Sequence, residues 1–192
     1  MTPQGLTSVD AALAHILADV TPLEGTESLP LARLRGRVLA ADAIATIDVP
    51  PADNSSMDGY ALRHADLEAG QRDFAVSQRV AAGTVGTMLM PGTVARIFTG
   101  AEVPPGADCV VIQENCGVAD GVVTVLQPVA PEDNIRRRGQ DIAAGGAIVA
   151  AGTRLGGAHA GLLAAVGMAR ATVFARLRVA ILSTGDELVE PG

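Results

Sequence analysis

Apolar residues recur at helical spacing near both ends of the chain. Over residues 9–20 they return every three or four positions, which predicts a helix with Thr7 or Ser8 as its N-cap. A short second helix is expected over 31–35, and residues 158–166 again have a helical pattern that a glycine ends. The flanks of the chain are therefore predicted to be helical.

The middle of the chain has the pattern of strands and turns. From residue 45 to residue 146, short apolar runs are separated by Gly, Pro or Asp roughly every ten residues. Asp120 and Gly121 have the composition of a hairpin turn. The expected strands cover residues 74–80, 93–98, 108–113, 122–127, 147–149 and 171–174. This pattern is typical of a small β-rich domain.

The order helix, strands, helix favours an α+β multidomain protein, in which a β-rich domain at 45–146 is inserted into a helical one. The elongated helical domain is expected to combine residues 1–44 with residues 147–176. Residues 177–182 are almost wholly apolar, so they are predicted to form a buried strand. That strand would begin an α/β domain over 177–192, of which the chain contains only the start.

Composition excludes several classes of function. No apolar run approaches the roughly 20 residues that span a bilayer, and the start lacks the pattern of a signal peptide. Two cysteines and three histidines are too few to indicate a zinc site or a disulfide framework. We therefore expect a soluble, cytoplasmic protein that does not bind a membrane.

All 14 basic residues are arginine, which excludes a phosphate-loop lysine and Schiff-base chemistry. The net charge is −7, and the chain has three Phe, one Tyr and no Trp. A nucleic-acid surface needs a basic face with stacking aromatic rings, so nucleic-acid binding is excluded.

The run Asp-Asn-Ser-Ser-Met-Asp-Gly-Tyr-Ala at 53–61 carries the strongest candidate chemistry. Two prolines precede it, and Gly59 is expected to turn the chain sharply so that the Asp58 carboxylate projects from a stiff loop. The alternative is an ordinary turn in which Asp58 accepts N–H bonds from its own loop. Thr99 and Gly100 likewise either hold an oxyanion through a hydroxyl and exposed amides, or simply end a strand.

Carboxylates and arginines on other glycine-containing turns extend this set. Asp58, Asp141 and Glu187 offer oxygen ligands suited to Mg2+, although Asp141 can instead pair with a neighbouring arginine. The arginines at 136–138 either bind a dianion such as phosphate or form a solvated surface run. Residues 183–187 follow the predicted buried strand, at the edge of an α/β sheet where ligands bind.

Four of these segments, in this order, resemble motifs of the molybdopterin molybdenumtransferase family, which comprises the MoeA proteins and the C-terminal domain of gephyrin. They lie at 54–61, 96–104, 134–142 and 183–188. The resemblance covers the chain from Leu13 onward. Family members are roughly twice as long, and their third domain begins where this chain ends. The resemblance also implies the inserted-domain arrangement proposed above.

The family reaction inserts molybdate into adenylylated molybdopterin and yields molybdenum cofactor and AMP, so the resemblance implies a transferase. It implies catalytic roles for Asp58, Thr99, Asp141 and Glu187, with Mg2+ bound by the three carboxylates. It implies substrate or anion binding by Ser56, Gly100, Arg136, Arg137, Arg138, Ser183, Thr184 and Asp186. Which of the three arginines binds the anion stays open.

The resemblance also implies a homodimer, with the site formed between the β-rich domain of one subunit and later domains of the other. The upstream enzyme would be a molybdopterin adenylyltransferase. Because the pterin and nucleotide pocket is expected mostly in those later domains, the 192-residue chain is predicted to be inactive alone. The alternative is a dimerising scaffold of the gephyrin type that binds peptides.

Overall fold

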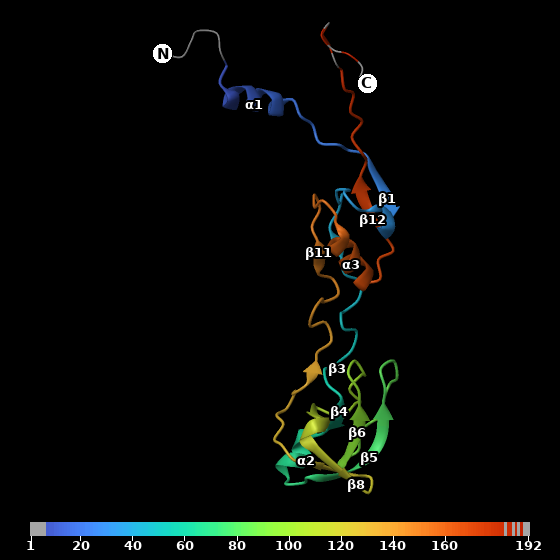
Figure 1. The fold of residues 1–192 in the computed structure, drawn as a ribbon. Coiled ribbons are helices and arrows are strands. Elements are labelled where there is room, and N and C mark those ends of the chain that lie inside the picture. Colours follow the sequence, from blue (N-terminus) through green and yellow to red (C-terminus); the bar gives the residue numbers. More distant parts are fainter. Residues whose placement is uncertain (1–6, 183, 186, 188, 190–192) are drawn as a thin grey trace.

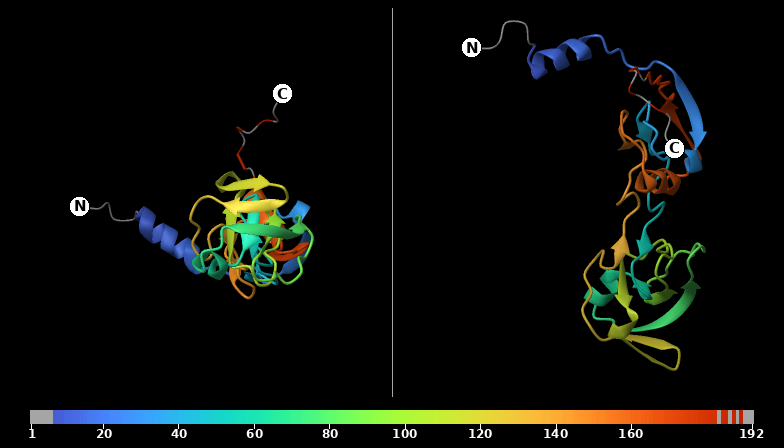
Figure 2. Two further views of the ribbon diagram at one scale, coloured as in Figure 1. Left: turned by 90° about the horizontal axis from the view of Figure 1, so that it is seen from below. Right: turned by 45° about the horizontal axis from the view of Figure 1, so that its top comes forward.

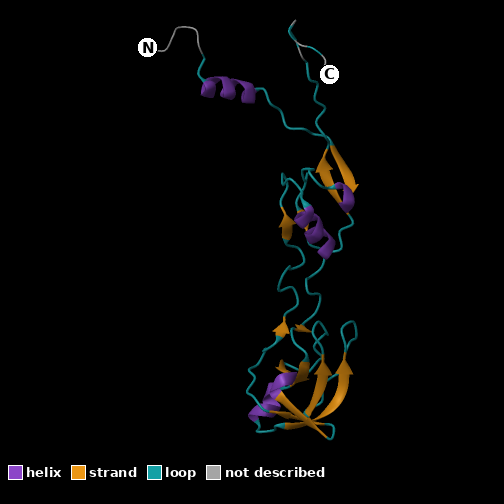
Figure 3. Cartoon of the chain, viewed as in Figure 1, coloured by secondary structure: helices purple, strands orange, loops and turns teal. Residues whose placement is uncertain are grey.

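The protein is elongated, with a β-rich unit at one end and a thinner stem leading to both termini (Figure 1). The computed structural model describes residues 7–182, 184, 185, 187 and 189. Strands and loops dominate it, and the helices are few and short (Figure 3). No helix within these residues is long and apolar enough to cross a membrane.

The β-rich unit is built on a curled, mixed six-stranded sheet in the order β7-β4-β6-β5-β9-β8. Its strands are β4 (Gly59–Leu62), β5 (Asp73–Val80), β6 (Thr93–Ile97), β7 (Cys109–Ile112), β8 (Cys116–Ala119) and β9 (Val122–Val125), with helix α2 at His64–Glu68 and 3-10 helix η2 at Gln113–Asn115. Only β5 and β6 run parallel; the other neighbours are antiparallel. The expected strands at 74–80, 93–98, 108–113 and 122–127 thus correspond to β5, β6, β7 and β9.

Both faces of this sheet are covered. Successive residues of β4 point to opposite sides, so Tyr60 and Leu62 join one core and Ala61 joins the other. Phe74 lies in the first core, below α2, and Ile97 lies in the second. Because every residue of β4 is buried, this strand reads as continuously apolar from Tyr60 onward and lacks the alternation of a surface strand.

The stem consists mainly of paired strands. Strand β1 (Thr26–Pro30) pairs with β12 (Arg170–Phe174), and β2 (Ala43–Ile44) pairs with β11 (Ala147–Val149). Helix α3 (Gly157–Ala165) packs against the 3-10 turn η1 (Leu31–Arg33) and β11. The core of the stem comprises Leu29, Leu34, Leu39, Ala43, Val149, Leu155, Leu163, Ala171 and Val173.

The predicted helical domain is therefore not found. Residues 31–35 form only the 3-10 turn η1, while α3 is the one described helix in the core of the stem. Helix α1 (Val9–Ala18) exists and is capped by Ser8, but it buries no residue. It projects away from the stem in all views (Figure 2). The helical spacing gave the correct local structure but did not indicate a packing partner.

Residues 177–182 were expected to form a buried strand, and this expectation is wrong for the single chain. They have no regular structure and their side chains are exposed; Ile181 is 89% accessible. No described strand pairs with them, so their N–H and C=O groups have no ladder to join. The described residues of 177–192 contain no strand. Ser183 and Asp186 lie outside the described residues, and the α/β start at 177–192 stays a prediction.

Two chain segments connect the stem to the β-rich unit and run side by side. Val49 pairs with Ile142 in an isolated bridge, and β3 (Asn54–Ser55) pairs with β10 (Ile135–Arg136). The Asp48 carboxylate accepts an N–H bond of 2.8 Å from Ala144 and so ties one segment to the other. This connection brings the 53–58 and 134–141 segments together.

Candidate functional site

Asp58 and Thr99 form the centre of the candidate site. Oδ1 of Asp58 accepts the Thr99 amide at 2.8 Å and the Thr99 hydroxyl at 2.7 Å. These two bonds, aided by the charge of Arg96, lower the pKa of the Asp58 carboxyl below its ordinary value. Asp58 lies between β3 and β4, and Thr99 lies two residues after the end of β6, so the strands hold both ends of the contact. The site therefore presents an ionised, oriented carboxylate.

The loop around Asp58 is more regular than the sequence indicated. Ser55 exchanges backbone bonds with the 99–101 loop, where its O accepts the Gly100 amide at 2.8 Å. Ser56 donates its amide to the carbonyl of Asn134 at 2.9 Å. The buried Ser55 hydroxyl bonds the carbonyl of Met57 at 2.6 Å. The 53–61 run is thus two short strands joined by a tight turn, packed between two other loops.

Glycine is required at position 59 for a different reason from the one expected. Its φ is not positive, so it is not required for a sharp turn. A Cβ at this position would lie 2.0 Å from the Val111 carbonyl oxygen, because β4 and β7 approach closely there. Glycine is needed for this approach of two strands. The explanation of Gly59 by turn chemistry was wrong.

The proposed oxyanion hole at Thr99 and Gly100 is not supported. The Thr99 amide donates to Asp58 and the Gly100 amide donates to Ser55, so both N–H groups are used. The Thr99 hydroxyl also donates to Asp58. Thr99 is therefore a positioning residue for the carboxylate rather than a ligand for an anion.

The three arginines at 136–138 all face carboxylates; Arg136 ends β10 and the other two follow it. Arg136 contacts Asp141 at 2.5 Å, and Arg138 contacts Asp48 at 2.6 Å. The Arg137 guanidinium pairs with Asp53 and Glu132, and these two carboxylates raise the pKa of Arg137. The pKa of Asp53 is lowered, first by the hydrogen bond from the Arg138 amide and then by Arg137.

These pairs place three cations among four carboxylates, so the cluster has no excess positive charge. Of the two sequence readings of Asp141, pairing with a neighbouring arginine is the one that the structure shows. Each guanidinium still has N–H donors that these carboxylates do not occupy, because Arg136 uses only its NH2 group and Arg138 only its Nε–H.

The described residues do not assemble the expected Mg2+ site. Within them, no three His, Cys, Asp or Glu side chains lie close enough to hold a metal ion. One oxygen of Asp58 is held by Thr99, and one of Asp141 by Arg136. The segment that carries Glu187 leaves the stem at the end opposite to the β-rich unit (Figure 1). A single chain therefore does not bring Glu187 to the other two carboxylates.

Arg96 is a site neighbour that sequence reasoning missed. It donates to the Gly59 carbonyl at 3.0 Å and to Oε1 of Gln113 at 2.6 Å. Its guanidinium also stacks on the rings of Tyr60 and Phe98, with centroid distances of 5.1 and 4.7 Å. Its position as the first residue of the 96–104 motif was the available signal. Its bond to the Gly59 carbonyl helps to hold the backbone directly after Asp58.

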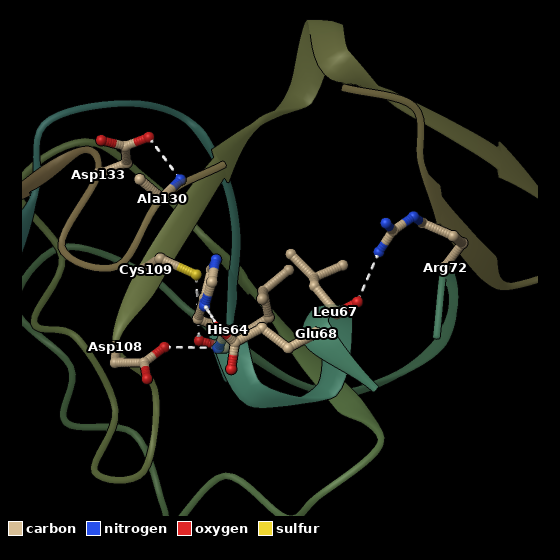
Figure 4. Close-up of polar contacts among 9 residues, drawn as sticks. His64, Leu67, Glu68, Arg72, Asp108, Cys109, Ala130 and Asp133 are labelled. Carbon is tan, nitrogen blue, oxygen red and sulfur yellow. Dashed lines mark hydrogen bonds and ion pairs between the residues drawn. The ribbon is translucent and has the colours of Figure 1, made fainter. Parts of the chain in front are cut away.

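A separate cavity of about 340 Å³ lies under α2, in the β-rich unit (Figure 4). His64 lines it and is anchored by its amide to Asp108 at 2.7 Å, while Arg72 donates to the Leu67 carbonyl at 3.0 Å. The nearby Cys109 thiol is buried, and burial raises its pKa to about 12. These bonds hold α2 in place, and none of the predicted site residues lines the cavity.

The sequence model of the MoeA N-terminal region, described as domains I and II, matches residues 7–167. The chain belongs to this family. It is 38% identical to the molybdopterin molybdenumtransferase of Haemophilus influenzae over 189 residues, which cover 97% of this chain and 46% of the relative. It is 37% identical to that of Synechococcus elongatus over 191 residues, 96% of this chain and 47% of the relative.

A solved structure of the molybdopterin biosynthesis MoeA protein from Pyrococcus horikoshii has the same fold. It superposes with a TM-score of 0.83 and 33% identity, covering 88% of this chain and 46% of that one. The chain thus spans about half the length of the relatives it matches. These relatives are named as transferases or as biosynthesis proteins, so the gephyrin-type scaffold is not favoured.

Proposed function

We propose that this MoeA-family chain contributes the N-terminal half of a molybdopterin molybdenumtransferase. Its reaction inserts molybdate into adenylylated molybdopterin and yields molybdenum cofactor and AMP. The observation that carries the proposal is the ionised Asp58 carboxylate, which Thr99 holds in the 54–61 motif of the family. Relatives with 37–38% identity over nearly the whole chain support the same reaction.

Asp58 has the properties of a fixed anion that orients a donor or a cation rather than those of a proton acceptor, because its pKa is lowered. Thr99 occupies Oδ1 with two hydrogen bonds and leaves Oδ2 as an anionic acceptor. The lowered pKa keeps Asp58 ionised at neutral pH, so its charge is available throughout the physiological range. The adjoining ionic surface comprises Asp141, Arg136, Arg137 and Arg138. A molybdate or phosphate anion would bind there through the guanidinium N–H groups that the carboxylates leave free.

The complete site is proposed to form between subunits in the cytoplasm. In a homodimer, Thr184 and Glu187 of one chain, with Ser183 and Asp186, would approach Asp58 and Asp141 of the other. Mg2+ would bind only in that dimer arrangement, because the described residues of one chain do not bring three carboxylates together. A molybdopterin adenylyltransferase would supply the substrate, whose AMP group leaves during insertion.

The test joins these 192 residues to the second half of the Haemophilus influenzae relative. AMP release and molybdenum content are measured with adenylylated molybdopterin, with and without molybdate. We expect molybdate-dependent cofactor formation by the chimera and none by the 192-residue chain alone. A chimera that dimerises and folds like the intact relative but releases no AMP would contradict the proposed function.

A further inference from the structure

A cavity of about 560 Å³ lies in the stem, at the end farthest from the β-rich unit, where β12 ends (Figure 1). Its volume falls within the usual range for ligand sites, roughly 300–1,000 Å³. None of the candidate site residues lines it, so the proposed reaction gives it no purpose.

Positive charge gathers at this cavity. Its lining includes four of the 14 basic residues of a chain whose net charge is −7: Arg35, Arg37, Arg154 and Arg176. Arg37 pairs with Glu27 at 2.6 Å, whereas the other three make no ion pair within the described residues. The arginine cluster of the candidate site differs, because each of its members has a carboxylate partner. A cleft lined by uncompensated charge of one sign concentrates ligands of the opposite sign.

Backbone pairing between two segments distant in the sequence brings these arginines together. The Gly36 amide donates to the Leu155 carbonyl at 2.8 Å, and the Leu155 amide donates to the Arg37 carbonyl at 2.7 Å. A Cβ on Gly36 would lie 4.0 Å from the NH2 group of Arg154, so this guanidinium extends beside the glycine. Arg37 and Arg154 therefore reach one cavity from two paired segments.

Arg37 retains donors that a ligand can use. Its side chain is 8% exposed, and its NH2 group donates to Oε1 of Glu27 at 2.6 Å and to the Phe174 carbonyl at 2.5 Å. A guanidinium has five N–H groups, and those on Nε and NH1 of Arg37 make no hydrogen bond to any described residue. They are not sealed in the interior, because Oδ1 of Asn54 is the one unpartnered buried side-chain atom in the described part of the chain. Since Arg37 lines the cavity, these N–H groups are available there.

We propose that this cavity binds a phosphate-type dianion, either free or as the phosphate group of a small organic molecule. The guanidinium fork matches the oxygens of such an anion and donates to two of them at once. Arg37 would bind from its fixed position, and the exposed Arg35 and Arg154 would close on the remaining oxygens. Leu23 and Phe174 provide apolar wall for an organic group.

The inference is independent of the proposed function, because the cavity lies in the stem and Asp58 lies in the β-rich unit. The number of guanidiniums sets the selectivity. Removing several cations from water is compensated only by a ligand with matching charge and enough acceptor oxygens. Chloride and nitrate, with one charge each, should therefore compete poorly with phosphate.

The experiment titrates the 192-residue chain with inorganic phosphate and with phenyl phosphate by calorimetry, with sodium chloride holding the ionic strength constant. Arg35→Gln and Arg154→Gln each remove one exposed guanidinium and should weaken phosphate binding by roughly 10-fold or more, because a charged hydrogen bond is lost. Tighter binding of phenyl phosphate identifies an organic ligand and equal affinity a free oxyanion, and both results support the site.

The matched control is Arg33→Gln, which removes the same charge from η1, outside the cavity. At physiological ionic strength distant charges are screened, so this variant should change the affinity by less than about twofold. Circular dichroism establishes that each variant is folded. The absence of saturable phosphate binding at about 1 mM, or equal weakening by Arg33→Gln and Arg154→Gln, would overturn the inference.

The same titration of the chimera tests the site in the longer protein. We expect phosphate to bind with the same dependence on Arg154. Loss of binding in the chimera would show that the added half covers the cavity, and it would overturn the inference. AMP release by the chimera is measured separately, so the proposed function stands or fails on its own result.

Discussion

Gly59→Ala tests the packing that holds the candidate site in place. The added Cβ would lie 2.0 Å from the Val111 carbonyl oxygen and 2.9 Å from the Val111 carbonyl carbon. Relief to an ordinary contact of 3.4 Å requires β7 to move away by about 1.4 Å. Since both obstructing atoms are backbone, no side-chain rotation can make room. The strain must be taken up by the β4–β7 ladder.

The expected loss of stability is about 3 kcal/mol or more, the upper end for overpacked sites. For a folded unit of this size it corresponds to a fall in the thermal midpoint of about 12 °C or more. Circular dichroism on heating measures this midpoint. The matched control is Gly117→Ala in edge strand β8, where the new Cβ meets no atom closer than 3.9 Å and should cause little change. Equal midpoints for the two variants would refute the β4–β7 register.

Three further predictions concern single side chains. Arg37→Leu should destabilise the stem by about 2 kcal/mol in urea unfolding, because a buried guanidinium loses charged hydrogen bonds. Unchanged stability would contradict this. Thr99→Val should raise the pKa of Asp58 in an NMR titration; as that pKa is depressed by folding, its stabilisation exists above the unfolded pKa and is lost as pH falls through the folded one. An unshifted titration would remove Thr99 from this role. Finally, a thiol reagent at pH 8 should label the buried Cys109 only after unfolding and the partly buried Cys116 slowly, since burial raises their pKa values to about 12 and about 11. Rapid labelling of Cys109 in the folded chain would contradict its burial.

The elements predicted correctly are those whose apolar pattern matches their own burial. Strands β5, β6 and β9 were found within two residues because they are regular apolar runs bounded by turn residues. Helix α3 was found for the corresponding reason, with helical spacing and a glycine stop. In such segments local pattern and tertiary environment agree.

The missed elements depend on contacts that a local pattern does not contain. Strand β1 is mostly polar, Thr-Glu-Ser-Leu-Pro, and exists because β12 pairs with it from the far end of the sequence. Strand β4 begins in a run of turn-forming residues, and its glycine is explained only by the nearness of β7. Residues 177–182 show the converse case, in which an apolar run has no strand to pair with. The domain boundaries at 45 and 146 stay a prediction.

The candidate site was predicted by residue type better than by geometry. The motifs located Asp58 and Thr99, and the structure joins them by two hydrogen bonds. Sequence reasoning did not foresee that the amides of Thr99 and Gly100 are consumed, nor that each arginine at 136–138 has a carboxylate partner. Apart from the local pair Arg136–Asp141, which was one of the two alternatives considered, these contacts join segments distant in the sequence, such as Arg138 with Asp48. Local composition carries no information on such pairings.

The most direct test of the account is the rate of molybdenum insertion by the Asp58→Asn variant of the chimera. The substitution keeps the size of the side chain and removes its charge, while Asp120→Asn changes an exposed hairpin carboxylate as the control. We predict a loss of roughly 100-fold or more for Asp58→Asn, the scale of a lost electrostatic contact in the transition state. Circular dichroism should show that the variant is folded at the assay temperature. The control should retain full activity. Insertion by Asp58→Asn at the rate of the unmodified chimera would contradict the central claim.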